Sequence, residues 1–126
     1  MNSSLAQPLL ETPRRILILD DQPFVAEAMA MSLRANGFAV RSFTSARQAL
    51  ENIENFDVLI TDYHMPEMTG LEVAKEAHTQ GWRGCLLLMS GHRQILADYK
   101  SHPLFQSVLL KPFPTAELVR ILRELT

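Results

Sequence analysis

The stretch VLITDYHMPEMTGL, residues 58–71, decides the fold that we predict for this chain. Val58 to Ile60 are β-formers without a polar break, a pattern typical of a strand buried on both faces of a parallel sheet. Asp62 then falls where the strand gives way to a loop. Ligands of helix-covered parallel sheets bind just beyond the carboxyl ends of the strands, so Asp62 is a candidate functional residue. Taken alone, it would more simply be a solvated loop acid.

The segment after Asp62 carries the signals of a loop that leads into a helix. Pro66 and Gly70 break any regular structure that began earlier. Thr69 and Glu72 have the spacing of a capping box, in which each side chain binds a backbone amide at the start of a helix.

Three other apolar runs also end in polar residues. They are Ile16–Leu19 before Asp20 and Asp21, Leu86–Met89 before Ser90, and Val108–Leu110 before Lys111. If all strands are parallel, these ends meet at one edge of the sheet and bring together carboxylates, a hydroxyl and an ammonium group. The simpler readings are acids at a helix N-terminus for one of the aspartates, and ordinary strand-end polarity for Ser90 and Lys111.

The gathered acids imply a metal ion. Two like charges about 4 Å apart repel by roughly 4 kcal/mol at an effective dielectric near 20, so three carboxylates are a poor arrangement without a cation. The donors are oxygens, without a cysteine or a pair of histidines among them, which favours Mg²⁺ over Zn²⁺.

The rest of the chain alternates between strand and helix patterns. Ala39–Phe43 reads as the second strand, and Ser45 with Gln48 has the form of a further capping box. The segment from His92 to Gln106 has weak periodicity and predicts a short or irregular helix, whereas the last helix has Thr115 as its nearest cap residue. Five alternations of strand and helix predict a doubly wound α/β fold.

Length and composition set limits on the function. A chain of 126 residues with 47% hydrophobic content suits one domain, which we place at residues 14–126 after a polar leader or linker at residues 1–13. A net charge of −2 gives no general attraction to nucleic acid, and we expect no direct binding to it. The apolar runs are too short to cross a bilayer, and the single Cys85 suits a reducing compartment. We therefore expect a cytoplasmic protein without membrane insertion.

Four motifs in this order resemble the receiver domain of two-component response regulators. They are Asp20-Asp21, Asp62 within DYHMPEMTG, Ser90-Gly91 and Lys111-Pro112-Phe113. Each motif is weak alone, but the set in order on the expected strand ends is specific, and the resemblance covers Arg14 to Leu125. It implies a flavodoxin-like fold, with a five-stranded parallel sheet in the order 2-1-3-4-5 and five helices.

The resemblance also implies roles for the residues at the sheet edge. Asp21 and Asp62 would bind Mg²⁺ directly together with the backbone carbonyl of His64, and Asp20 would act through a bound water. The Asp62 carboxylate would be the phosphoacceptor.

Two further residues would contact the phosphoryl group, Lys111 as a point charge and Ser90 through a hydrogen bond. The implied donor is a phosphohistidine on a sensor histidine kinase or a phosphotransfer protein, with small acyl phosphates as substitutes. The domain would catalyse its own phosphorylation and dephosphorylation without turning over an external substrate.

Three positions depart from the family pattern or bear on its kinetics. Val108 stands where receivers usually carry an aromatic residue or histidine, three residues before the lysine, so the route of the signal is expected to differ. His64 and His92 lie two residues after Asp62 and Ser90, where they would flank the path of water to the phosphoryl group. The simpler reading of both is a solvated imidazole.

Other functions stay open at this point. The second hypothesis is a constitutive protein-binding module that keeps the fold but signals independently of phosphate. A phosphohydrolase is remote, because no second carboxylate follows Asp62 by two residues. We expect no output domain within this chain, and the sequence leaves open the downstream partner, a homodimer, and whether the domain is freestanding or part of a longer regulator.

Overall fold

The computed structural model describes residues 14–125. The leader predicted at residues 1–13 lies outside the described residues, as does residue 126. Among the described residues, five strands and five α-helices alternate along the chain.

The strands form one parallel sheet in the order β2-β1-β3-β4-β5. Their bounds are β1 Arg15–Leu19, β2 Ala39–Phe43, β3 Val58–Asp62, β4 Cys85–Ser90 and β5 Ser107–Leu110. Every pairing is parallel, and in the register Asp62 stands opposite Met89 while Ser90 stands opposite Leu110. The predicted fold class and strand order are confirmed.

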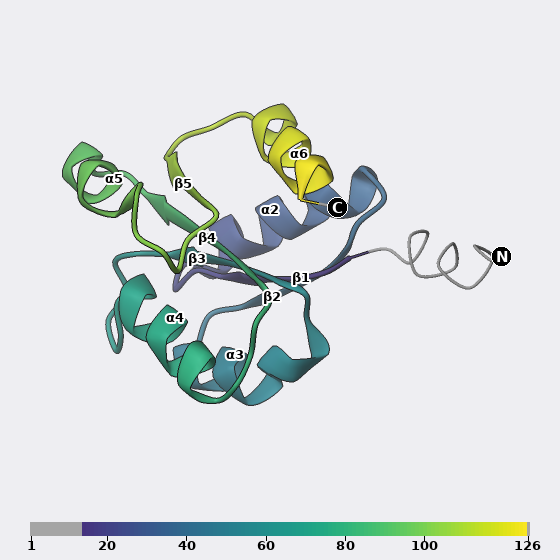
Figure 1. Ribbon diagram of the computed structural model, residues 1–126. Helices are drawn as coiled ribbons and strands as arrows, with labels where there is room; N and C mark the ends of the chain where they lie inside the picture. Colours follow the sequence, from purple (N-terminus) through teal and green to yellow (C-terminus); the bar gives the residue numbers. More distant parts are fainter. Residues whose placement is uncertain (1–13, 126) are drawn as a thin grey trace, which may run out of the picture.

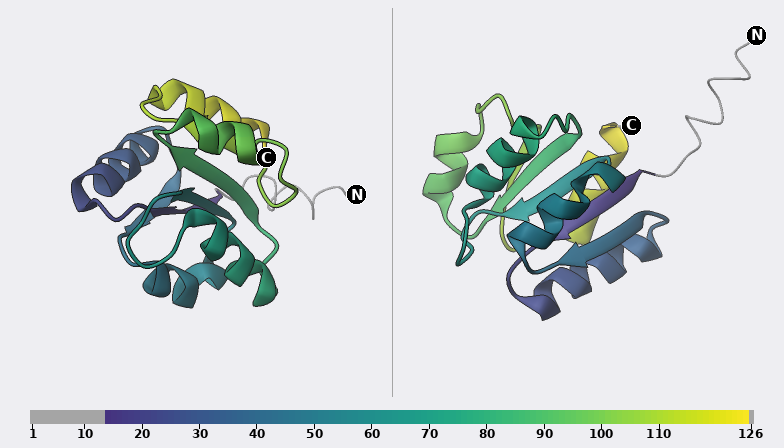
Figure 2. Two further views of the ribbon diagram at one scale, coloured as in Figure 1. Left: turned by 90° about the vertical axis from the view of Figure 1, so that its left-hand side faces the viewer. Right: turned by 90° about the horizontal axis from the view of Figure 1, so that it is seen from below.

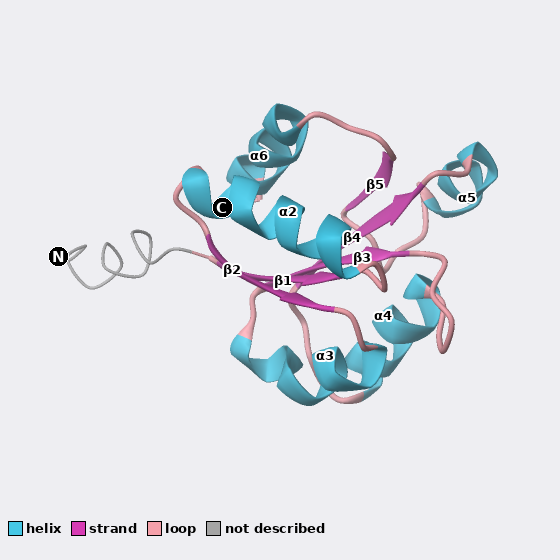
Figure 3. Cartoon of the chain, turned by 180° about the vertical axis from the view of Figure 1, so that it is seen from behind, coloured by secondary structure: helices cyan, strands magenta, loops and turns pink. Residues whose placement is uncertain are grey.

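The helices cover both faces of this sheet. Their bounds are α2 Pro23–Ala35, α3 Ala46–Asn52, α4 Gly70–Thr79, α5 Arg93–Tyr99 and α6 Thr115–Glu124, with a 3-10 turn η2 at Ile53–Asn55. α2 and α6 lie on one face, and α3 and α4 lie on the other (Figure 1; Figure 3 from behind). α5 lies apart from these four, at the end of the sheet where β4 and β5 lie.

Burial on both faces explains why the strands read as continuous apolar runs. Ile16 and Ile18 belong to the core beneath α2 and α6, while Leu17 and Leu19 belong to the core beneath α3 and α4. All four side chains are fully buried. Apolar burial contributes about 25 cal/mol per Å², so the central strands fix the sheet in place and with it the edge where they end.

The helix starts follow the expected local chemistry with one exception. Pro23 occupies the first turn of α2, where its missing N–H costs no hydrogen bond. The side chain of Ser45 caps α3 by accepting a hydrogen bond from the Gln48 amide. The expectation of Thr115 as a cap is wrong, because Thr115 is the first residue of α6 and the extended Pro114 precedes it without a side-chain cap.

The capping box at the start of α4 is confirmed in full. The Glu72 amide donates to the Thr69 hydroxyl at 3.1 Å, and the Thr69 amide donates to the Glu72 carboxylate at 2.8 Å. α4 therefore begins at a fixed point directly after the loop that leaves β3. Of the described residues, no helix is long and apolar enough to span a membrane.

The strand arrows point toward the left of Figure 1, and the left panel of Figure 2 views the molecule from that side. β1 and β3 both end at this edge. Asp20 and Asp21 follow β1, and Asp62 is the last residue of β3. The fold thus brings together residues that are about 90 positions apart along the chain, such as Asp20 and Lys111, whose sequence separation is 91.

Removing the Thr69 cap is expected to destabilise the domain. Thr69→Ala should lower the free energy of unfolding by about 0.5–2 kcal/mol, because the Glu72 amide at the start of α4 loses the hydroxyl that caps it. Urea unfolding followed by circular dichroism measures the difference. Thr79→Ala, at the exposed end of the same helix, is the matched control and should stay within about 0.5 kcal/mol of the parent. An equal loss in both variants would remove the cap as the cause.

Candidate phosphoacceptor and metal site

Three aspartates meet at the carboxyl edge of the sheet. Asp20 and Asp21 follow β1, and Asp62 is the last residue of β3, which pairs with β1. One carboxylate oxygen from each lies within 4.8 Å of the others. The convergence predicted from the strand ends is therefore present in the structure.

Hydrogen bonds hold the buried Asp20 in this position. Its backbone amide donates to the Phe43 carbonyl at 3.1 Å, and its side chain accepts from the Gln22 amide at 3.0 Å. Only 1% of the Asp20 side chain is exposed. A carboxylate so deeply buried requires a compensating charge.

Lys111, the residue directly after β5, supplies part of that charge. Its ammonium nitrogen lies 2.9 Å from Asp20 and 3.5 Å from Asp62. The Lys111 amide donates to the Ser90 carbonyl at 2.8 Å, which continues the β4–β5 ladder to the point where the lysine side chain turns toward the acids. One ammonium against three carboxylates leaves excess negative charge at the edge.

Burial and these contacts shift the pKa values of Asp62 and Lys111. Burial raises the pKa of the Asp62 carboxyl above its ordinary value, and Asp20 adds to the rise while Lys111 and the Tyr63 amide oppose it. Burial lowers the pKa of Lys111, but its hydrogen bond to Asp20 and the charges of Asp62 and Asp20 outweigh that effect and raise it overall. The ammonium therefore stays charged at neutral pH.

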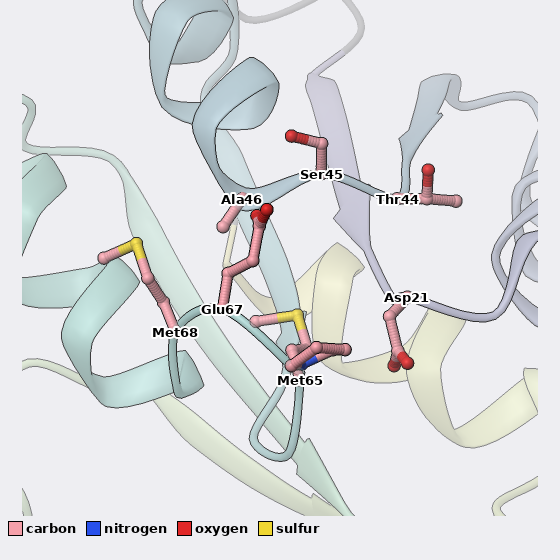
Figure 4. Close-up of a pocket in the computed structure, with 8 residues that line it drawn as sticks. Asp21, Thr44, Ser45, Ala46, Met65, Glu67 and Met68 are labelled. Carbon is pink, nitrogen blue, oxygen red and sulfur yellow. The ribbon is translucent and has the colours of Figure 1, made fainter.

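The donor set suits a hard divalent cation. Carboxylate oxygens from Asp20, Asp21 and Asp62 lie close enough to share one ion, and they are the ligands that Mg²⁺ prefers. Asp21 also lines a cavity of about 280 Å³ (Figure 4), so this side of the cluster is open to solvent. The cavity is lined by Asp21, Thr44, Ser45, Ala46, Met65, Pro66, Glu67 and Met68.

Ser90 ends β4 beside the acidic cluster. It is fully buried, and its hydroxyl accepts a hydrogen bond from the His92 amide at 3.0 Å. The neighbouring Gly91 is exposed, and the chain leaves the sheet there toward α5. Ser90 thus lies at the same edge as Asp62, one register position beyond it.

His64 and His92 are both exposed, and their rings meet. The ring centres lie 4.6 Å apart in an edge-to-face arrangement, across two loops that leave neighbouring strands. His64 also contacts the Tyr63 ring at 4.8 Å. Both imidazoles are thus exposed to solvent, as the simpler reading expects, and they also contact each other, which the sequence did not predict.

Gly70 has a role that the sequence did not reveal. We read it as a break, but it is the first residue of α4, and a Cβ built there would lie 2.5 Å from the Asp62 carbonyl and 2.8 Å from Leu88. Only a residue without a side chain allows α4 to start this close to β3. The available signal was a glycine directly after the cap residue Thr69, but the sequence pattern does not reveal how close that glycine lies to Asp62.

Val108 is partly buried against the core beneath α3 and α4. No aromatic ring stands on β5, whose sequence is SVLL. Two aromatic rings contact each other elsewhere, those of Tyr63 and of Tyr99 in α5, and their ring centres lie 5.5 Å apart. The sequence analysis missed both tyrosines, because they are 36 residues apart and lie in segments without a shared period.

Comparison with known proteins agrees with this geometry. A family model described as the response regulator receiver domain matches residues 16–123. This chain belongs to that family. The transcriptional regulatory protein FixJ of Azorhizobium caulinodans is 31% identical over 109 residues, which cover 84% of this chain and 52% of FixJ. The response regulator protein TodT of Pseudomonas putida is 33% identical over 111 residues, which cover 86% of this chain and 49% of TodT.

The receiver domain therefore spans about half the length of the curated relatives it matches. Among solved structures, the response regulator TrrA of Thermotoga maritima in complex with Mg²⁺-BeF has a TM-score of 0.80 and 26% identity, covering 90% of this chain and 99% of TrrA. A receiver domain from Methylobacillus flagellatus has a TM-score of 0.82 at 24% identity, covering 91% of this chain and all of that one, and shows the shared fold.

The raised pKa of Asp62 makes a pH-dependent contribution to stability. A carboxyl with a raised folded-state pKa destabilises the fold above that pKa, and the penalty vanishes below the unfolded value of about 3.9. Asp62→Asn should therefore increase the free energy of unfolding in chelator-containing buffer at pH 7, and increase it less at pH 4.5. Urea unfolding at both pH values measures the gain.

A gain that is equal at both pH values would contradict this assignment. Glu76→Gln is the control for the loss of one negative charge, because Glu76 is an exposed acid on α4, whereas the Asp57 carboxylate accepts a hydrogen bond from the Arg15 amide. Its effect should lack the increase between pH 4.5 and pH 7 that marks the buried carboxyl.

Proposed function

We propose that this receiver domain accepts a phosphoryl group on Asp62 from a phosphohistidine of a sensor histidine kinase or phosphotransfer protein, in a Mg²⁺-dependent phosphorelay. The observation that carries the proposal is the convergence of three carboxylates and Lys111 at one sheet edge. An exposed acid would need none of these neighbours. A cytoplasmic location fits this role and stays a prediction.

Asp62 is the nucleophile in this proposal. One of its carboxylate oxygens forms a bond to phosphorus while the bond from phosphorus to the donor's imidazole nitrogen breaks, and the electron pair leaves with the imidazole, which takes up a proton. The remaining groups act by position and charge. Lys111, 3.5 Å from Asp62, pairs with a phosphoryl oxygen, and Ser90 donates its hydroxyl to another.

Asp20, Asp21 and Asp62, with the backbone carbonyl of His64, are the residues that would hold Mg²⁺. When bound, the ion neutralises the charge that gathers on the phosphoryl oxygens. Attack of water on the aspartyl phosphate returns the free carboxylate, so the domain resets its own state.

A constitutive binding module is the second candidate, favoured by Val108 and by the absence of buried residues in α5. Such a module would present the same surface in both states of Asp62. The retained acidic cluster with Lys111 favours the phosphoacceptor instead.

The phosphoacceptor is tested by intact mass. Incubation with acetyl phosphate and Mg²⁺ should add the mass of one phosphoryl group to the parent and none to Asp62→Asn, because an amide keeps the shape but not the nucleophile. Asp57→Asn, just before the other end of β3, should be phosphorylated like the parent. A base-labile phosphoryl group on Asp62→Asn would show that another residue is the acceptor.

The metal site is tested by titration calorimetry with MgCl₂. We expect weak binding to the unphosphorylated parent, and a loss of about tenfold or more in Asp21→Ala, since even outer partners of a metal site are worth about 10–100-fold. Glu67→Ala is the matched control, because Glu67 lines the cavity beside Asp21 but is outside the three-acid cluster. Unchanged affinity in Asp21→Ala would remove Asp21 from the ligand set.

A further inference from the structure

Helix α5 is held more loosely than the other helices of the domain. It has no buried residue, whereas α2, α3, α4 and α6 each bury three or more. Ile95 and Tyr99 are partly buried and pack against the core. Few buried apolar contacts mark an element that shifts at low cost in free energy, so the contacts that do hold α5 decide where it lies.

Two consecutive residues after Asp62 contact the two ends of this helix. His64 meets His92, the N-cap residue of α5, with ring centres 4.6 Å apart. Tyr63 meets Tyr99, the last residue of α5, with ring centres 5.5 Å apart and hydroxyl oxygens 3.5 Å apart. We call these two pairs of side chains the ring clamp.

The ring clamp is anchored directly at the phosphoacceptor. The Tyr63 amide donates to an Asp62 carboxylate oxygen at 3.1 Å, and also to the Met89 carbonyl at 2.8 Å. On the other side, the His92 amide donates to the Ser90 hydroxyl. A change in charge or position at Asp62 or Ser90 therefore acts on the backbone of a clamp residue without an intermediate.

The contacts continue beyond α5 toward β5. The Tyr99 ring contacts His102 at 5.9 Å and Phe105 at 6.4 Å, and Phe105 is buried in the core. The connection before β5 is thus packed on the same ring that Tyr63 touches. Val108 on β5 offers no ring of its own for such a contact.

We propose that the ring clamp couples the phosphorylation state of Asp62 to the position of α5, with Tyr63 and His64 as positioning residues. The inference rests on the proposed phosphorylation of Asp62. Phosphorylation changes the charge of the carboxylate that accepts from the Tyr63 amide, and the phosphoryl group recruits the Ser90 hydroxyl that accepts from the His92 amide, so the clamp contacts change at both ends of the helix. The surface of α5 then differs between the two states, and a partner can distinguish them.

Hydrogen exchange of the purified domain tests the clamp. Without phosphorylation, amides in the last turn of α5 should exchange faster in Tyr63→Ala than in the parent. They should exchange at the parent's rate in Tyr63→Phe, which keeps the ring contact. Addition of beryllium fluoride and Mg²⁺ should change the exchange across residues 93–105 in the parent and in Tyr63→Phe. Tyr63→Ala should lose this response in the last turn of α5 and in the connection to β5, which are the parts that the Tyr63–Tyr99 contact holds.

The affinity for beryllium fluoride gives a second test, made by changing Tyr99, the partner of Tyr63 in the clamp. If α5 and Asp62 are coupled, Tyr99→Ala should change the affinity for beryllium fluoride by about fivefold or more, while Tyr99→Phe should not. His78→Ala, an exposed histidine of α4, is the control for surface substitution and should match the parent.

The outcomes separate this inference from the function it rests on. If the parent gains no phosphoryl mass from acetyl phosphate, both proposals are overturned. If the parent and Tyr63→Ala are phosphorylated and residues 93–105 respond equally in both, the phosphoacceptor stands and the ring clamp is overturned. Loss of the α5 response in Tyr63→Ala, with phosphoryl mass retained and the response restored in Tyr63→Phe, supports the clamp.

Discussion

The carboxylates of Asp20, Asp21 and Asp62 repel one another, and the fold holds them together regardless. The parallel sheet fixes their backbones, because β1 and β3 are buried on both faces and pair directly. Lys111, directly after β5, offsets part of this repulsion with its ammonium group 2.9 Å from Asp20. The free energy of the core thus maintains a concentration of negative charge that suits a divalent cation.

Much of this arrangement could be predicted from the sequence, because two simple rules apply to it. Continuous apolar runs mark strands buried on both faces, and the carboxyl ends of parallel strands meet at one edge. Those rules bring Asp62 and Lys111 together without knowledge of any distance. Local rules also located the Thr69–Glu72 capping box. They failed at α6, where an extended proline precedes the first turn and Thr115 lies inside the helix.

The ring contacts could not be predicted by the same means. Tyr63 and Tyr99 lie in a loop and in a short helix whose phase the weak periodicity does not fix, so their meeting depends on side-chain rotamers and on packing. The role of Gly70 was hidden for a related reason. Its requirement for a missing side chain arises from the Asp62 carbonyl and from Leu88, and neither is a neighbour in the local sequence pattern.

The close approach of Gly70 to Asp62 gives the two helices beside the site different mechanical character. α4 is fixed to the end of β3 by a backbone contact with no room for a methyl group, and it buries four residues. α5 buries none. The helix on one side of the site is therefore packed tightly, and the helix on the other side is held by few buried contacts. A pair of spectroscopic labels, with α4 as the fixed reference and the second label on α5, would therefore report a change at Asp62 as a change in the distance between the two helices.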